Sequence, residues 1–303
     1  MKVQRIGLVG YGEVGKIFSA GLQSRVDQVS AWDLTFDAEA TAVRPRDVEL
    51  AHAAQAGVRA CASLQALCEN ADCIISAVTA SNTLAVAQAA AQYIRVGTIF
   101  LDLNSASPGT KQQAAQAVDA AGGHYVEAGV MASVPPHGIR VPMLLGGAHA
   151  AALAETLRGW GLDAKAVASE IGVASAIKMC RSVMIKGLEA LVIESYTTAR
   201  HYGVEDQMIP TMAETFPSID WQQIGAYFFS RVAQHGKRRA EEMREAAHTV
   251  REAGFEPWMA AAIAGEHDWV AQQAQTGIFK GLPKGARWQE YADRLMVARK
   301  AMP

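Results

Sequence analysis

The sequence predicts an α/β domain built on a mostly parallel sheet, followed by an all-α domain, in a chain of 303 residues. In the first half, short runs of β-forming residues alternate with alanine-rich helical stretches, an order typical of a parallel sheet covered by helices on both faces. After about residue 170 the β-forming runs stop, and helical patterns continue. We therefore expect two domains, residues 1–168 and 169–303, joined by one long helix.

The elements are expected as follows. Strands are predicted at residues 2–9, 28–32, 72–78, 98–101, 124–127 and 142–145, with helices at 13–23, 82–94 and 108–121. Pro108 suits the first position of its helix, and Gly122-Gly123 suits the end. The proline-free stretch 172–202 predicts one helix of roughly 45 Å. Further helices are predicted at residues 204–216, 219–254 and 257–275.

The composition excludes several classes of protein. Half of the residues are hydrophobic and 19% are charged, which excludes an intrinsically disordered chain. Lysine and arginine number 28 against 30 aspartates and glutamates, and the net charge of −2 gives no bulk attraction for nucleic acid or an anionic membrane. We expect the partner to be a small molecule or a second copy of the chain.

The cysteines, histidines and N-terminus bear on metal binding and on the cellular compartment. The four cysteines lack a CxxC spacing and the eight histidines lack HExxH or paired spacing, so neither a disulfide framework nor a metal site is expected. The chain enters a strand-like segment at residues 3–9 without the features of a signal peptide. No apolar run approaches the ~20 residues of a membrane helix. These observations favour a soluble cytoplasmic protein.

A glycine-rich loop lies directly between the first predicted strand and the first predicted helix. It reads Gly10-Tyr11-Gly12-Glu13-Val14-Gly15, a GxGxxG pattern. Gly10 permits a tight turn, Gly12 allows the backbone to approach a pyrophosphate, and Gly15 allows helix and strand to pack closely. The helix N-terminus then offers N–H groups and a partial positive charge to phosphates. The pattern in this context predicts that these six residues bind a dinucleotide.

Asp33 follows the second predicted strand, about 20 residues after the glycine loop. A carboxylate at this place accepts hydrogen bonds from the adenosine ribose and repels a 2′-phosphate, which favours NAD over NADP. Asp33 could instead be a solvated side chain, and Arg44 and Arg46 could reach a 2′-phosphate, so NADP stays possible. Val78, at the end of the strand expected at residues 72–78, completes the predicted cofactor site.

A polar loop follows the strand expected at residues 98–101. It reads Asp102-Leu103-Asn104-Ser105-Ala106-Ser107-Pro108. Ligands of open α/β sheets bind at the carboxyl ends of strands, and amide and hydroxyl groups beside a helix N-terminus suit a carboxylate. We therefore place Asn104 and Ser105 in the substrate site. The loop could equally be an ordinary helix cap, with Ser107 as the N-cap.

Lys178 lies on the predicted long helix among apolar neighbours. Loss of solvation lowers the pKa of a lysine, so its amine can exchange a proton with a hydroxyl while a hydride moves to nicotinamide. A lysine in this position could also be ion-paired or extend to solvent. Lys186 is the other candidate for the proton-transferring lysine. It lies eight residues further along the predicted helix, ~12 Å away, so only one of the two can reach the nicotinamide, and the glycine that precedes the helix favours Lys178.

Together these segments resemble the β-hydroxyacid dehydrogenase family, which includes 3-hydroxyisobutyrate, tartronate semialdehyde and 6-phosphogluconate dehydrogenases. Residues 10–15 match its cofactor loop, residues 102–108 its substrate loop, residues 144–147 the segment that closes its sheet domain, and residues 172–178 its glycine-to-lysine segment. The resemblance implies a Rossmann-type NAD(P)-binding domain, a long interdomain helix, and a helical domain for substrate binding and dimerisation. It also implies that Lys178 is the catalytic lysine.

Departures from the family concern the substrate site. The family's Asp-Ala-Pro-Val-Ser-Gly-Gly loop is replaced by Glu127-Ala128-Gly129-Val130-Met131-Ala132-Ser133. Ser182 replaces an asparagine, and Glu241-Glu242 stand near the place of a Lys-Asp pair. These changes resemble a divergent bacterial branch with an unusual C-terminal domain. Besides Asn104 and Ser105, the predicted substrate residues are Val130, Met131, Ala132, Ser133 and Ser182.

The predicted function is hydride transfer between NAD, or NADP, and a small β-hydroxy acid or related hydroxy compound. Lys178 would act as general base in oxidation and as general acid in reduction, with substrate between the two domains. Two alternatives are an imine reductase on the same scaffold and a non-catalytic NAD-binding sensor. The presence of Lys178 argues against the imine reductase, because such enzymes usually have another residue at the position of the lysine. A homodimer formed through the helical domain is expected.

Overall fold

The computed structural model describes residues 3–36 and 46–300. The chain forms two compact units, residues 1–179 and 180–303. The last strand of the sheet ends at Ala168, where the sequence places the domain boundary, and the first turns of the following helix belong with the sheet unit. The assignment of separate roles to residues 1–168 and 169–303 stays a prediction.

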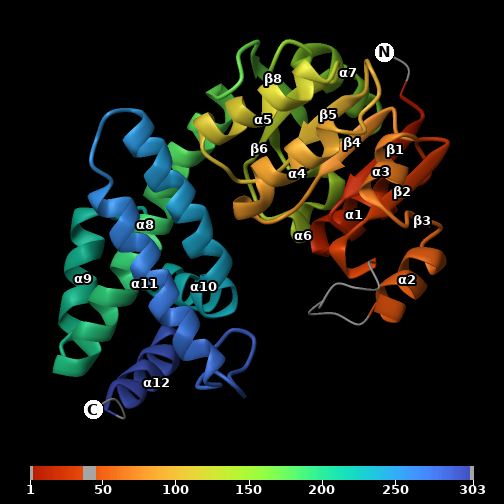
Figure 1. The fold of residues 1–303 in the computed structure, drawn as a ribbon. Helices are drawn as coiled ribbons and strands as arrows, with labels where there is room; N and C mark the ends of the chain where they lie inside the picture. The colour runs from red at the N-terminus through yellow and green to blue at the C-terminus, as the bar shows by residue number, and fades with distance from the viewer. Residues whose placement is uncertain (1–2, 37–45, 301–303) are drawn as a thin grey trace. The chain divides into compact units, whose positions relative to one another are not determined.

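The first unit is built on an eight-stranded sheet with the order β3-β2-β1-β4-β5-β6-β7-β8 (Figure 1). The strands are β1 (Arg5–Val9), β2 (Gln28–Trp32), β3 (Arg59–Ala60), β4 (Cys73–Ser76), β5 (Ile99–Asp102), β6 (His124–Val130), β7 (Met143–Gly146) and β8 (Ala164–Ala168). All neighbouring strands pair in parallel except β6 and β7, which are antiparallel. The mostly parallel sheet and the doubly wound arrangement are confirmed.

Helices cover both faces of the sheet because successive side chains of each strand point to opposite faces. Along β1, Ile6 and Leu8 belong to one buried cluster and Val9 belongs to the other. The first cluster includes residues of α1 (Glu13–Leu22), α2 (Arg46–Gln55) and α7 (Ala150–Gly159). The second includes residues of α3 (Leu64–Cys68), α4 (Thr83–Ala91) and α5 (Pro108–Ala120). A short α6 (Val134–His137) follows β6.

The second unit is all-helical, as predicted. Its helices are α8 (Val173–Tyr202), which begins in the first unit, α9 (Glu205–Thr215), α10 (Trp221–Glu252), α11 (Trp258–Gln275) and α12 (Trp288–Lys300). Its core includes Tyr196, Phe229 and Trp288, all nearly inaccessible to solvent. Over the described ranges, no helix is both long enough and apolar enough to span a membrane.

Charged side chains are buried between α8, α10 and α11 within the second unit. Lys186 Nζ lies 2.9 Å from Glu242 Oε2, and Arg239 Nε donates to Glu189 Oε2 over 2.8 Å. His267 is fully buried beside this group, and neither ring nitrogen has a hydrogen-bond partner in the described part of the chain. Burial, together with the positive charges of Arg239 and Lys186, lowers the pKa of His267 to about 3.

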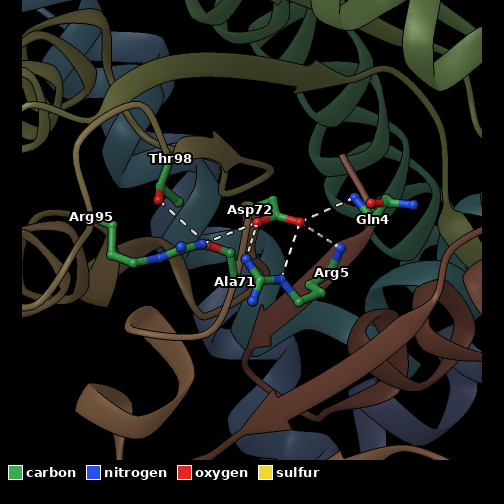
Figure 2. A network of polar contacts seen from close by, with 6 residues as sticks. All are labelled: Gln4, Arg5, Ala71, Asp72, Arg95 and Thr98. Atoms are coloured by element: carbon green, nitrogen blue, oxygen red, sulfur yellow. Dashed lines mark hydrogen bonds and ion pairs between the residues drawn. The ribbon is translucent and has the colours of Figure 1, made fainter. Parts of the chain in front are cut away.

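A polar network ties the amino-terminal edge of the sheet together (Figure 2). Asp72, just before β4, accepts hydrogen bonds from the backbone N–H groups of Gln4 and Arg5 and from the Arg5 guanidinium. Arg95 donates to the same carboxylate and to the carbonyl of Ala71. The side-chain hydrogen bond from Arg5 holds the pKa of Asp72 well below its usual range. This edge lies opposite the carboxyl ends of the strands, so the network serves stability.

The buried state of His267 predicts an acid-sensitive second unit. The pKa of His267 is about 3 in the folded protein against 6.5 in its ordinary state, so only the unfolded chain binds a proton there as the pH falls below 6.5. Between pH 7 and pH 5 the free energy of unfolding should fall by about 2 kcal/mol more in the wild type than in His267→Leu. Urea unfolding at both pH values measures this difference. Equal pH dependence in the two proteins would contradict it.

Candidate active site

The glycine loop has the geometry that its sequence predicts. Gly10 has a φ of +96°, its N–H donates to the carbonyl of Trp32 over 2.9 Å, and a side chain there would overlap the carbonyl of Ala77. A side chain at Gly15 would overlap the carbonyl of Gly10. Gly12 faces open space, with no atom within 4 Å of the position its Cβ would take. Gly10 and Gly15 therefore close the turn, while Gly12 leaves room for a ligand.

The N-terminus of α1 is open for a phosphate group. Gly12 is its N-cap and supplies no side-chain hydrogen bond to the N–H groups of the first turn. Those groups and the helix dipole form an anion site, which fits the pyrophosphate of a dinucleotide. Glu13 is exposed, and Val14 is half-buried against the core.

Hydrogen bonds from Tyr11 and Thr35 fix Asp33 at the end of β2. Its Oδ2 accepts from the backbone N–H of Tyr11 over 2.7 Å, and its Oδ1 accepts from the N–H and the hydroxyl of Thr35. Asp33 is half-buried and joins the glycine loop to the end of β2. These contacts fit the predicted ribose-binding role, which stays a prediction.

The two arginines that could favour a 2′-phosphate differ in what the structure describes. Arg46 begins α2, and its Nε donates to the carbonyl of Phe36 over 2.9 Å, so its guanidinium is held by the protein backbone. Arg44 lies outside the described residues. Nearby, Lys16 of α1 forms an ion pair with Glu49 of α2 at 2.8 Å.

Residues from two sequence-predicted segments, the strand expected at residues 72–78 and the polar loop 102–108, meet at the carboxyl ends of β4 and β5. The side-chain oxygen of Asn104 accepts from the N–H of Val78 over 2.7 Å, and its side-chain nitrogen donates to Ser76 Oγ over 3.0 Å. Asn104 is 3% exposed. Its amide therefore joins the loop after β5 to the end of β4. The proposed contact of Asn104 with substrate is untested, and in this structure both ends of the amide already bind protein groups.

A buried ion pair, which sequence reasoning missed, supports the same loop. Asp102 and Lys111 are both completely buried, with Lys111 Nζ 3.0 Å from Asp102 Oδ1. Tyr125 donates its hydroxyl to the other carboxylate oxygen over 2.5 Å, and the N–H of Asn104 donates to Oδ1 over 2.8 Å. Burial and the charge of Asp102 raise the pKa of Tyr125 well above its usual range. The carboxylate thus fixes the start of the loop that carries Ser105.

Lys178 and Ser105 lie in direct contact. Lys178 Nζ donates to Ser105 Oγ over 2.5 Å, and both residues are half-buried. The predicted catalytic residue and one predicted substrate residue are therefore brought together from segments 73 positions apart. The capping role of Ser107 is also present, since its Oγ accepts from the N–H of Thr110 over 3.3 Å. The loop is a helix cap and, at Ser105, a partner of the lysine.

The segment that carries Lys178 is fixed by Glu127, another residue without a role in the sequence prediction. Glu127 is fully buried in β6, and its carboxylate accepts from the backbone N–H groups of Gly172, Ala174 and Ser175 at 2.7, 3.0 and 3.3 Å. These are the N–H groups at the start of α8 that no helix carbonyl can bind. Glu127 therefore caps α8 from the neighbouring strand.

Gly129 allows this helix to approach the sheet closely. A Cβ at Gly129 would lie 2.9 Å from the carbonyl oxygen of Ala174 and 3.5 Å from the Cβ of Lys178. The φ of Gly129 is not positive, so the requirement is for space and not for an unusual backbone conformation. The sequence identified this glycine only as a departure from a family pattern.

The remaining predicted substrate residues are placed as follows. Val130 ends β6, and Met131, Ala132 and Ser133 connect it to α6, with the N–H of Met131 bonded to the carbonyl of Pro142. Met131 and Ser133 are half-buried and Ala132 is exposed. These residues follow the carboxyl end of β6, at the same sheet edge as the glycine loop and Ser105.

Ser182 lies in the second unit, where its Oγ accepts from Lys186 Nζ over 3.1 Å. Lys186 is buried and also paired with Glu242, so this rival lysine is part of a structural ion pair. The role of Ser182 in substrate binding stays a prediction. In the described ranges, no three side chains of histidine, cysteine, aspartate or glutamate are grouped as metal ligands.

Two family models match the chain. Residues 5–154 match the NAD binding domain of 6-phosphogluconate dehydrogenase, and residues 199–270 match a domain of unknown function (DUF1932). The first match covers the sheet from β1 to α7, including the glycine loop, Asp33 and Ser105. The second covers α9, α10 and much of α11.

Two solved structures are related to the chain over nearly its whole length. A conserved hypothetical protein from Sinorhizobium meliloti 1021 is 35% identical, with 97% of this chain and 96% of that chain covered and a TM-score of 0.76. The conserved protein MTH1747, of unknown function and described as structurally similar to 3-hydroxyacid dehydrogenases, is 28% identical, with 90% and 98% covered and a TM-score of 0.69.

More distant structures share the fold alone. A 3-hydroxyisobutyrate dehydrogenase of Mycobacterium tuberculosis, solved with L-serine, is 15% identical, with 97% of this chain and 99% of that chain covered and a TM-score of 0.66. An imine reductase of Streptomyces aurantiacus is 16% identical over the same shares of the two chains, with a TM-score of 0.53.

The fold and the glycine loop define an NAD(P)-dependent oxidoreductase, with the cofactor bound by the sheet unit. The chain combines an NAD binding domain like that of 6-phosphogluconate dehydrogenase with a domain of unknown function, which fits a divergent β-hydroxyacid dehydrogenase-like protein.

The close packing at Gly129 gives a prediction for this site. In Gly129→Ala the new methyl group meets backbone at 2.9 Å, so the first turns of α8 must shift and carry Lys178 with them. We expect kcat to fall by ~10²-fold, the effect of a displacement of about 1 Å, while the dissociation constant of NADH stays unchanged. Stopped-flow kinetics and NADH fluorescence measure the two quantities. The matched control is Gly97→Ala on the same unit, where no atom lies within 4 Å of the added carbon. Because Gly97 has a φ of +81°, its variant should lose stability without a change in kcat.

Proposed function

We propose that the protein transfers a hydride between NAD and a small β-hydroxy acid, or a related hydroxy compound, with Lys178 as general acid and base. The observation that carries this proposal is the hydrogen bond of 2.5 Å between Lys178 Nζ and Ser105 Oγ. Both residues belong to the sheet unit, and Ser105 follows the carboxyl end of β5 as the glycine loop follows that of β1. A proton-transferring group is thus present at the sheet edge where the cofactor binds.

The chemistry assigns a distinct task to each group. The glycine loop and Asp33 would hold the dinucleotide, whose nicotinamide would supply the hydride chemistry at the carbon that carries the hydroxyl. In oxidation, the neutral amine of Lys178 takes the proton of the substrate hydroxyl as the carbonyl forms, and in reduction the ammonium returns it. The Ser105 hydroxyl accepts a hydrogen bond from Lys178 and holds its Nζ at the reacting oxygen. Asp102 and Asn104 keep the loop of Ser105 in place.

A carboxylate on the substrate fits the start of α5. Ser107 caps this helix and Pro108 occupies its first turn, so the helix dipole favours a negative group beside Ser105. Met131 provides an apolar neighbour directly after β6, and it stands at the position of the serine in the family's Asp-Ala-Pro-Val-Ser-Gly-Gly loop. We infer a short hydroxy acid with an apolar substituent, bound with help from Val130, Ala132 and Ser133.

Removal of Lys178 tests the mechanism. We expect Lys178→Ala to lower kcat by ~10²–10⁴-fold, because the step loses its general acid and base, and to leave NADH binding intact. The control is Lys165→Ala, which removes an exposed lysine of β8 on the same unit and should leave kcat unchanged. Unchanged turnover in Lys178→Ala would remove the proposed mechanism.

The preference for NAD rests on Asp33. Its fixed carboxylate should repel a 2′-phosphate, so kcat/KM should be higher with NAD than with NADP. Asp33→Asn removes the charge and should lower the ratio of kcat/KM with NAD to kcat/KM with NADP at least ~10-fold. The control Asp119→Asn, a change remote from the glycine loop, should leave this ratio unchanged. A preference of the wild type for NADP would show that Asp33 does not discriminate in this way.

One screen separates this function from the two alternatives. NADH fluorescence is followed with hydroxy acids, hydroxy amino acids and sugar acids in one direction, and with aldehyde acids and a cyclic imine in the other. Turnover of the imine alone would indicate an imine reductase. Tight NADH binding without any turnover would indicate a non-catalytic sensor.

We also propose a homodimer formed through the second unit, and a cytoplasmic location. Phe255, Trp258 and Met259 support the dimer, because these large apolar side chains are 71%, 79% and 56% exposed at the junction of α10 and α11. Sedimentation at several concentrations tests it.

A further inference from the structure

The start of α8 has no capping group of its own. Gly172 precedes the helix with a φ of +111° and has no side chain to bind the N–H groups of the first turn. Ser175 directs its hydroxyl to the carbonyl of Gly172, not to an N–H group. The free N–H groups are instead bound by Glu127, which lies 45 residues earlier in the chain. The position of α8 on the sheet is therefore set by a contact that is not part of the helix.

The charge of Glu127 has little other compensation. The side chain is completely buried, and in the described part of the chain its carboxylate forms no salt bridge. An isolated buried carboxylate is costly, so the three N–H groups and the helix dipole must stabilise it. This dependence works in both directions. The helix cannot move away from β6 without leaving a charge buried and unpaired.

Lys178 lies one helical turn beyond Ala174, on the same face of α8. The N–H of Ala174 binds Glu127, and the Cβ of Lys178 lies 3.5 Å from the position that a Cβ on Gly129 would take. Over these residues the helix advances along β6 from Glu127 toward Gly129. The contact at Glu127 thus fixes both the height and the rotation of the turn that carries Lys178.

Ser105, the hydrogen-bond partner of Lys178, is held in place by a residue of β5, the strand next to β6. Asp102 of β5 pairs in register with Glu127 of β6, and it binds the N–H of Asn104, next to Ser105. Two adjacent buried carboxylates therefore hold the two ends of the hydrogen bond between Lys178 and Ser105.

We propose that Glu127 is a positioning residue for Lys178, which sets the first turn of α8 so that the amine reaches Ser105. The catalytic part of this inference rests on the proposed function of Lys178, but its structural part does not require the substrate to be known.

The test replaces the charge and keeps the shape of the side chain, in Glu127→Gln. Competitive acetylation with trace acetic anhydride, read by mass spectrometry across a pH series, reports the reactivity of Lys178 against exposed Lys165. Hydrogen exchange reports the N–H groups of residues 172–178. Both are measured on the full-length protein with NADH bound. Asp220→Asn is the matched control, because Asp220 caps α10 of the second unit through the N–H of Gln223.

In Glu127→Gln we expect at least ~10-fold faster exchange at residues 172–178, and a change of at least ~3-fold in the reactivity of Lys178 relative to Lys165. With the best substrate of the screen, kcat should fall ~10–100-fold while KM changes less than ~3-fold. Asp220→Asn should alter none of these. Glu127→Asp keeps the charge but shortens its reach, so it serves as the second variant and should give an intermediate result.

Unchanged exchange and unchanged Lys178 reactivity in a folded Glu127 variant would overturn the proposal. The two hypotheses fail separately. If Lys178→Ala keeps full activity while Glu127→Gln still alters the reactivity of Lys178, the catalytic role is wrong and the positioning role stands.

Discussion

The active-site half of this protein depends on two carboxylates that are buried next to each other on the strands β5 and β6. Asp102 and Glu127 are both inaccessible to solvent, and burial of a charge is costly unless the group is fully bound. Each is compensated differently, Asp102 by Lys111 and Tyr125, and Glu127 by the N-terminus of α8. The groups that stabilise these buried charges belong to segments of the site that must be held in place. The same contacts therefore fix the positions of those segments.

The sequence was sufficient for features whose cause is local. The glycine loop follows from the steric needs of one turn, so Gly10, Gly12 and Gly15 could be assigned before any contact was known. The contact of Lys178 with Ser105 was not visible in spacing, and the two residues were linked only by a family resemblance. Glu127 could not be predicted at all, since its role appears only when β6 and the start of α8 are neighbours. A buried acidic residue within an otherwise apolar strand was the one available signal.

The same distinction explains the elements of the fold. The six predicted strands exist because each carries a run of apolar residues that the sheet buries on both faces. The strands that were not predicted are β3, which has two residues, and β8, which is only partly buried. Helices α2, α3, α6, α7 and α12 were also not predicted. Helices α3 and α6 have only five and four residues, too few to show a helical period. Helix α7 does repeat buried apolar residues at helical spacing, at Ala150, Leu153, Ala154 and Leu157, and the sequence analysis overlooked this pattern.

The antiparallel pairing of β6 with β7 decides the route of the chain into the site. Because β8 runs parallel to β7, its direction is opposite to that of β6. Its last residue, Ala168, lies level with Glu127, three residues before the end of β6, and α8 starts shortly after it in the chain. From the level of Glu127, α8 runs along β6 toward the carboxyl end of that strand, and after about one turn and a half Lys178 reaches Ser105. In a wholly parallel sheet the same helix would begin at the ligand edge and run away from it. This single reversal of strand direction thus allows a rigid helix, α8, and not a flexible loop, to position the amine of Lys178.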